Sequence, residues 1–276
     1  MKNLIVRALT GAVYVALLVG CTVCHPLAAF VFFTLVSVAT LWEFGTIMNR
    51  HYGAEVVRPV NALAGALLSS SVWLFSMGAP SAGQMVALYG VTLLYLLVSE
   101  LYRQSADPIR NWTLTFASQL YVAVPFALLP VISVGTEGYT WVYVLSLFVF
   151  LWTNDTGAYL CGSALHNVFP AKLFERISPK KSWVGSIGGG ILTLLVAALI
   201  SRWDTSLTLL QWLGFALVVV FFGTWGDLVE SLLKRQLGIK DSGNILPGHG
   251  GLLDRFDSSL LALPAAVVYL YTLMIV

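Results

Sequence analysis

Four carboxylates in the C-terminal part of the chain have the spacing of a site for a metal ion and phosphate. Asp227 and Glu230 are three residues apart, and so are Asp254 and Asp257, which places each pair on one face if its segment is helical. Magnesium prefers oxygen ligands and commonly combines one or two carboxylates with the phosphates of a substrate. For any one of these residues alone, the alternative to a binding role is an ordinary charge that faces water at the membrane surface. Their density within one stretch favours a magnesium and phosphate site.

Basic residues and glycines fill the stretch between the two acidic pairs. Lysine and arginine side chains hold phosphate oxygens through charge-assisted hydrogen bonds. Pro247 and the glycines of "LPGHGG" form a loop whose backbone N–H groups can approach a phosphate closely. His249 lies between two of these glycines, and a base, a ligand and a simple hydrogen-bonding residue are all open roles for it. The residues expected to bind substrate here are Lys234, Arg235, Lys240, His249, Gly250 and Gly251.

Two stretches further upstream carry polar residues at the ends of apolar runs. "FLWTNDTGAYLCG" places Asp155 at the end of one run, and "RISPKKSWVGSIGGG" places Lys180 and Lys181 just before the next. A basic loop ahead of a helix N-terminus is a suitable anion site. The alternatives are an ordinary helix end for the first stretch and a membrane-topology signal for the second.

The composition predicts the elements that must position these residues. The chain of 276 residues is 58% hydrophobic and 10% charged, whereas soluble domains carry about 25% charged residues. We therefore expect an all-α polytopic integral membrane protein, with spans of about 20 apolar residues. Pro125 and Pro130 interrupt one of them, which we expect to be kinked or broken. The expected spans, about nine in number, are 5–24, 26–47, 60–78, 83–102, 112–133, 139–161, 184–201, 208–228 and 259–276.

The positive charges predict how these spans are oriented. With about nine spans, only Arg202 of the 15 lysines and arginines falls in an odd-numbered connection. By the positive-inside rule, the N-terminus is then cytoplasmic and the C-terminus lies on the opposite side. The first apolar run reads as an uncleaved helix rather than as a signal peptide, because no clear cleavage site follows it. We expect the bacterial inner membrane as the location, with the active site facing the cytoplasm.

We divide the chain into two regions on the position of its charges. Residues 1–138 are expected to be N-terminal transmembrane helices. Residues 139–276 are expected to be a catalytic transmembrane region, with cytoplasmic connections at 162–183 and 229–258, because the acidic and basic clusters all lie there.

The C-terminal cluster resembles the signature of the phosphatidate cytidylyltransferases, also called CDP-diacylglycerol synthases. "NDTGAY" and "SPKKSW" resemble two further motifs of that family, in the same order upstream. The sequence departs from the family at Val184, where a glutamate is usual, and this puts part of the metal or nucleotide binding in doubt. The residues that carry the resemblance are Ser231, Lys234, Arg235, Lys240, Asp241, Gly243, Leu246, Pro247, His249, Gly250, Gly251, Asp254, Arg255 and Asp257.

The resemblance implies a reaction in which CTP and phosphatidic acid give CDP-diacylglycerol and pyrophosphate. It also implies a need for Mg²⁺, with a second cation such as K⁺ as an open alternative. The partners would be CTP, phosphatidic acid and the lipid bilayer, with no nucleic acid and with a homodimer left open. The expected catalytic residues are Asp227, Lys234, Asp254 and Arg255, the metal ligands Asp227, Glu230, Asp254 and Asp257, and the additional substrate-binding residues Asp155, Lys180 and Lys181.

Two other functions compete with this interpretation. A membrane transporter of an anionic solute would place its polar residues near the bilayer midplane, often in two repeated halves. Here the charges gather at the ends of spans in the C-terminal half, and no repeat is evident. A CTP-dependent lipid-alcohol kinase would suit the same cluster, but it would release CDP instead of pyrophosphate.

Overall fold

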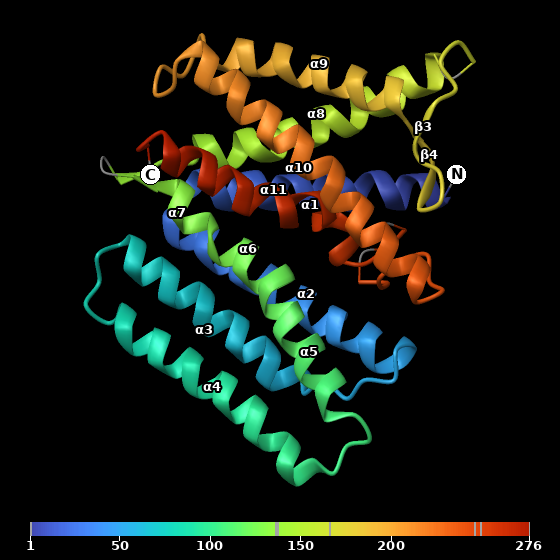
Figure 1. Ribbon diagram of the computed structural model, residues 1–276. Coiled ribbons are helices and arrows are strands. Elements are labelled where there is room, and N and C mark those ends of the chain that lie inside the picture. The colour runs from blue at the N-terminus through green and yellow to red at the C-terminus, as the bar shows by residue number, and fades with distance from the viewer. Residues whose placement is uncertain (1, 136–137, 166, 246, 249, 276) are drawn as a thin grey trace. The chain divides into compact units, whose positions relative to one another are not determined.

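The apolar runs of the sequence form long helices in the computed structural model of the chain (Figure 1). The structure describes residues 2–135, 138–165, 167–245, 247–248 and 250–275. Within these ranges, eight helices are long and apolar enough to cross a membrane. The chain is therefore an all-α polytopic membrane protein, as predicted, with two short antiparallel hairpins as its described strands.

The helices group into two compact units, each of which draws on two parts of the chain. The first unit contains Met1–Trp141 and Gln236–Phe256, and the second contains Val142–Arg235 and Asp257–Val276. The sequence-based division near residue 138 lies close to the start of the second unit. The segment 236–256, which the sequence-based division includes in the catalytic region, packs in the first unit.

In the first unit, α2, α3 and α4 pack side by side (Figure 1). Leu41, Phe44 and Met48 of α2 are among its buried core residues, together with Ala64 of α3. The elements of this unit are α1 (Lys2–Cys24), α2 (Pro26–His51), α3 (Arg58–Ser76), α4 (Ala82–Arg103), α5 (Pro108–Ser118), η1 (Gln119–Ala123), α6 (Val124–Ala127), α7 (Leu129–Ser133), β1 (Val134–Gly135) and β2 (Gly138–Tyr139).

The proline-containing span of the first unit is broken, as predicted. The segment Pro108–Ser133 contains α5, a π-helical turn at η1, and the short helices α6 and α7. A proline cannot donate to the carbonyl four residues earlier, so regular helix is interrupted before Pro125 and again before Pro130.

In the second unit, a hairpin of two short strands leads directly into α9, and α9 packs against α8 (Figure 1). Ser182 is the N-cap of α9, and its hydroxyl accepts a hydrogen bond from the Gly185 N–H at 3.2 Å. The elements of this unit are α8 (Val142–Leu165), β3 (Lys172–Phe174), β4 (Ser178–Ser182), α9 (Trp183–Ile200), α10 (Leu209–Gln236) and most of α11 (Leu253–Thr272).

Two C-terminal helices differ from the expected spans. α10 continues to Gln236, so the connection expected at 229–258 begins only after that residue. Lys234 and Arg235 occupy the last turn of α10, where cations are favourable beside the free carbonyl groups of a helix end. α11 corresponds to the ninth expected span, but it is not among the eight helices that qualify as spans by length and hydropathy.

Candidate active site

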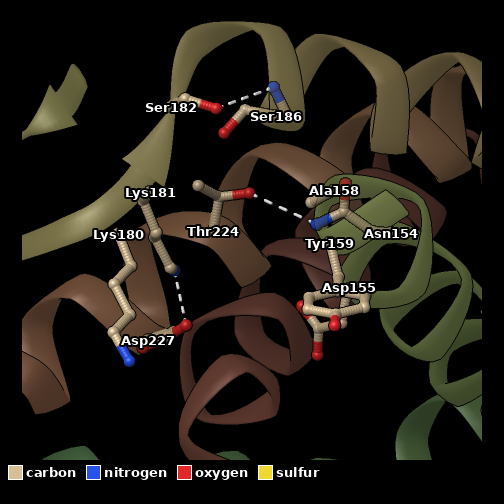
Figure 2. Close-up of a pocket in the computed structure, with 11 residues that line it drawn as sticks. Asn154, Asp155, Ala158, Tyr159, Lys180, Lys181, Ser182, Ser186, Thr224 and Asp227 are labelled. Carbon is tan, nitrogen blue, oxygen red and sulfur yellow. Dashed lines mark hydrogen bonds and ion pairs between the residues drawn. The ribbon is translucent and has the colours of Figure 1, made fainter. Parts of the chain in front are cut away.

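A polar cavity of about 280 Å³ lies in the second unit, among α8, β4, α9 and α10 (Figure 2). Three of its lining residues, Asp155, Lys180 and Lys181, were predicted to bind substrate, and a fourth, Asp227, to bind metal. The structure thus brings together residues that are up to 72 positions apart in the sequence. The cavity is lined by Asn154, Asp155, Ala158, Tyr159, Lys180, Lys181, Ser182, Gly185, Ser186, Thr224 and Asp227.

An ion pair between Lys181 and Asp227 crosses this cavity. The Lys181 Nζ lies 2.5 Å from the Asp227 carboxylate, and the two side chains are 26% and 27% exposed. The other oxygen of Asp227 accepts a hydrogen bond from the Ser231 hydroxyl at 3.1 Å, one helical turn further along α10. Both charged groups are partly exposed to solvent. An anionic ligand can therefore replace Asp227 as the partner of Lys181, and a cation can replace Lys181 as the partner of Asp227.

The β3–β4 hairpin positions the two lysines at the start of α9. Its strands pair antiparallel, with Lys172 opposite Ser182. Lys180 and Lys181 are adjacent on β4, so their side chains leave opposite faces of the strand, and both still reach the cavity (Figure 2). The first turn of α9 adds the positive end of the helix dipole, which favours a bound phosphate. Two of its N–H groups, those of Trp183 and Gly185, already donate to the Ala171 carbonyl and the Ser182 hydroxyl.

Close packing of α8 against α9 fixes the opposite wall of the cavity. Glycines on both helices permit it, because a Cβ at Gly157 would lie 2.9 Å from the Cα of Gly189. The buried side chain of Asn154 donates a hydrogen bond to the Thr224 hydroxyl of α10 at 3.4 Å (Figure 2). Asn154 and Thr224 were not predicted as site residues, although Asn154 directly precedes Asp155 in a motif that the sequence had singled out.

A second close approach brings Asp257 of α11 near Asp227 of α10. A Cβ at Gly226 would lie 2.6 Å from the backbone oxygen of Asp257 and 3.0 Å from the Cα of Ser258, so only glycine fits there. Asp257 precedes the apolar part of α11. Burial, and secondly the charge of Asp227, raise the pKa of Asp257 to about 7. Asp155 adds to this repulsion.

These carboxylates fit a magnesium ion that is shared with a substrate. Carboxylates that raise one another's proton affinity are stabilised in their charged forms by a bound cation. In the described part of the chain, no three histidine, cysteine, aspartate or glutamate side chains form a ready-made metal site. Magnesium commonly takes one or two protein carboxylates and completes its shell with water and substrate phosphates. Asp227 and Asp257 are the residues of the second unit that would hold it.

Two predicted residues of α10 are paired with each other. The Lys234 ammonium forms an ion pair with the Glu230 carboxylate one turn earlier, and the Glu230 side chain is fully buried. Glu230 was predicted as a metal ligand and Lys234 as a phosphate-binding residue. Arg235 is exposed, and its Nε donates to the carbonyl of Ile177 at 3.4 Å, which links the end of α10 to the hairpin.

The remaining predicted residues lie in the first unit, around the loop that precedes α11. The Asp254 carboxylate accepts hydrogen bonds from the backbone N–H groups of Ser242 and Gly251, both at 2.8 Å. Gly250 has a φ of +81°, a conformation that favours glycine, and its missing side chain leaves room for Asp254. Lys240 and Arg255 are exposed, and His249 lies outside the described residues.

The sequence of the chain is similar to those of known proteins. The sequence profile of the cytidylyltransferase family matches residues 5–273. A phosphatidate cytidylyltransferase of Staphylococcus aureus (strain COL) is 47% identical over 123 residues, which are 44% of this chain and 46% of that protein. The phosphatidate cytidylyltransferases of Staphylococcus haemolyticus and Staphylococcus saprophyticus are 46% and 45% identical over the same shares. The chain thus spans about half the length of the curated relatives it matches.

Proposed function

Since the chain belongs to the cytidylyltransferase family, we propose that it transfers the cytidylyl group of CTP to phosphatidic acid. The products are CDP-diacylglycerol and pyrophosphate. The observation that carries this proposal is the cavity at the polar ends of apolar helices, where Lys180, Lys181 and the start of α9 face Asp227. Such a site suits one substrate that is anchored in lipid and another that is dissolved in water.

The reaction is a displacement at phosphorus. A phosphate oxygen of the lipid attacks the α-phosphorus of CTP, a new P–O bond forms, and the bond to the β-phosphate breaks to release pyrophosphate. The second pKa of a phosphomonoester is about 6, so the nucleophile is already ionised near neutral pH. No strong general base is needed, and the main difficulty is to bring two polyanions together.

The residues of the cavity are suited to that difficulty. We propose that Lys180 and Lys181 bind phosphate oxygens, and that the positive end of the α9 dipole adds to this attraction. Asp227 and Asp257 would hold Mg²⁺, which supplies positive charge to the phosphates when it is bound. Release of Lys181 from Asp227 would accompany binding, because the lysine then pairs with phosphate and the carboxylate with the cation.

Several finer assignments remain predictions. Asp254 and Arg255, in the first turn of α11, are proposed to act in the same reaction. We also propose that the site faces the cytoplasm of a bacterial cell, where CTP is available, and that the acyl chains of phosphatidic acid stay in the inner membrane.

The proposal is tested by pyrophosphate release from purified protein in detergent with added phosphatidic acid, CTP and magnesium. We expect release only when all three components are present, and we expect Asp254→Asn to abolish it in a folded protein. Release of CDP in place of pyrophosphate would indicate a lipid-alcohol kinase. Movement of an anionic solute into vesicles without consumption of CTP would indicate a transporter. Near-normal activity of Asp254→Asn would remove this residue from the machinery.

A further inference from the structure

Glu43 of α2 lies at the start of α11, whose first turn carries Asp254, and beside Ser242 of the preceding segment. It belongs to none of the motifs discussed above, and it is almost 200 positions away from the loop in the sequence. Its side chain is only 5% exposed, within a helix that is apolar enough to cross a membrane. A carboxylate in such a place is costly unless it has partners, and a functional role is the first hypothesis for it.

The partners of Glu43 are the first backbone amides of α11 and a serine of the loop. One carboxylate oxygen accepts from the Leu252 N–H at 3.0 Å, and the other accepts from the Leu253 N–H at 3.1 Å. The first N–H groups of a helix have no partner within the helix and favour a negative charge. Glu43 therefore caps the N-terminus of α11 from a distant helix of the same unit.

Ser242 connects Glu43 to Asp254. Its hydroxyl lies 2.5 Å from the Glu43 carboxylate and 2.9 Å from the Asp254 carboxylate. The hydroxyl has a single proton, so it can donate to only one of these two carboxylates at a time. The same Asp254 oxygen accepts from the Ser242 N–H at 2.8 Å. The position of Asp254 thus depends on the position of Ser242, and Ser242 is held by Glu43.

Two glycines of the loop are fitted closely around the Glu43 side chain. A Cβ at Gly243 would lie 2.8 Å from one carboxylate oxygen of Glu43, and a Cβ at Gly251 would overlap the other. Both glycines lie in the stretch that resembles the family signature, so part of that glycine pattern is explained by room for Glu43.

We propose that Glu43 is a positioning residue that holds Ser242 and the start of α11 and, through Ser242, fixes the carboxylate of Asp254 for cytidylyl transfer. This inference rests on the proposed function for its effect on turnover. Its structural part, the fixing of the loop, stands without that function. Glu43 touches neither substrate nor metal in this proposal, and it acts only through the loop.

The test compares Glu43→Gln with Glu100→Gln. Glu100 is a matched control, because it is also buried in a candidate span of the first unit, is 6% exposed, and accepts hydrogen bonds from Arg103, Ser105 and Asn111. Glutamine at position 43 keeps the size of the side chain but turns one acceptor into a donor that faces a backbone N–H. We expect a fall in kcat of about tenfold to a hundredfold for Glu43→Gln, since a displacement of about 1 Å can cost about 10²-fold. Glu100→Gln should change kcat by less than about threefold at a comparable loss of thermal stability.

A double-mutant cycle separates positioning from a general loss of stability. If Glu43 acts through Ser242, the pair Glu43→Gln and Ser242→Ala should lose little more turnover than the more damaging single variant, because interacting residues are not additive. If the double variant loses turnover by the product of the two single losses, the two residues act independently and the proposal is wrong. If Glu43→Gln does not fold, Ser242→Ala alone must still lower kcat more than Glu100→Gln does, and wild-type turnover in Ser242→Ala would overturn the proposal as well.

Amide hydrogen exchange of the metal-free protein gives a readout that does not depend on turnover. We expect the amides of Ser242, Gly251, Leu252 and Leu253 to exchange at least about tenfold faster in Glu43→Gln and to be unchanged in Glu100→Gln. If the wild-type protein releases no pyrophosphate but this local change appears, the proposed function fails and the loop-holding role stands. If the wild-type protein is active and Glu43→Gln retains both its turnover and its exchange rates, the inference fails and the function stands.

Discussion

The contact between α8 and α9 makes a prediction that can be measured with one pair of substitutions. A Cβ at Gly189 would lie 2.8 Å from the Asn154 side-chain oxygen and 3.0 Å from the Ala158 backbone nitrogen, and it would overlap the Asn154 carbonyl oxygen. These are mostly backbone atoms, which cannot move out of the way without a shift of α8. A Cβ at the adjacent Gly190 would meet only a methyl group of Val220, at an ordinary 3.6 Å.

The expected magnitude follows from the difference between these two environments. Replacing glycine by alanine inside a helix favours the helix by about 1 kcal/mol, and this gain is common to Gly189→Ala and Gly190→Ala. Insertion of a methyl group into a fully packed contact costs about 1–3 kcal/mol. The free energies of unfolding of the two variants should therefore differ by roughly 1–3 kcal/mol. At about 2–4 °C per kcal/mol, Gly189→Ala should unfold at least about 2 °C below Gly190→Ala.

The same substitution should also affect turnover, since Asn154 and Ala158 both line the cavity. A displacement of α8 by about 1 Å can lower a reaction rate by about 10²-fold. We expect pyrophosphate release by Gly189→Ala to fall at least about tenfold, and release by Gly190→Ala to stay near the wild-type rate. Thermal unfolding in detergent and a pyrophosphate assay on the same preparations would measure both effects. Equal unfolding temperatures and equal rates for the two variants would refute the close-packing argument.

Two further predictions concern the ion pair that crosses the cavity. Asp227→Asn should abolish turnover, because the carboxylate is needed to hold the cation. Its unfolding temperature should stay close to that of the wild type, because the side chain is only partly buried. Near-normal pyrophosphate release by this variant would exclude Asp227 from the metal shell. Lys181→Met keeps most of the apolar stem and removes one charge-assisted contact to phosphate, worth about 1.5–3 kcal/mol, so kcat/KM for CTP should fall at least about tenfold. Lys172→Met on the paired strand is the matched control, because Lys172 is exposed and does not line the cavity. Equal kcat/KM values for the two lysine variants would contradict a phosphate-binding role for Lys181.

The class of fold and four of the eleven residues that line the cavity can be predicted from the sequence alone. Apolar runs of about 20 residues are long enough to cross a bilayer, so their lengths alone predict membrane helices. The break of one span at Pro125 and Pro130 followed from the missing N–H of proline. Lys180 and Lys181 are predicted because a basic loop before a helix N-terminus suits an anion. Asp227 is predicted because a carboxylate near the end of an apolar span is costly unless it is paired, hydrated or bound to a cation. Asp155 follows from the resemblance to the family.

Which of these residues lie together depends on how the helices pack. It paired Lys181 with Asp227 and Lys234 with Glu230, and it placed Asp257 beside Asp227 through a close approach at Gly226. Such pairs depend on how closely helices approach, and that distance is set by a few glycines whose neighbours cannot be read from sequence spacing.

The contacts of Glu43 are the clearest example of contacts that the sequence does not predict. A carboxylate within an apolar helix signals a role, but the sequence gives no indication of what it binds. Its partners, Ser242, Leu252 and Leu253, belong to a segment that packs with the first unit although it follows α10 of the second. Local sequence patterns specify the helices, whereas contacts between distant segments arise only when those helices pack and each buried polar group must find a partner.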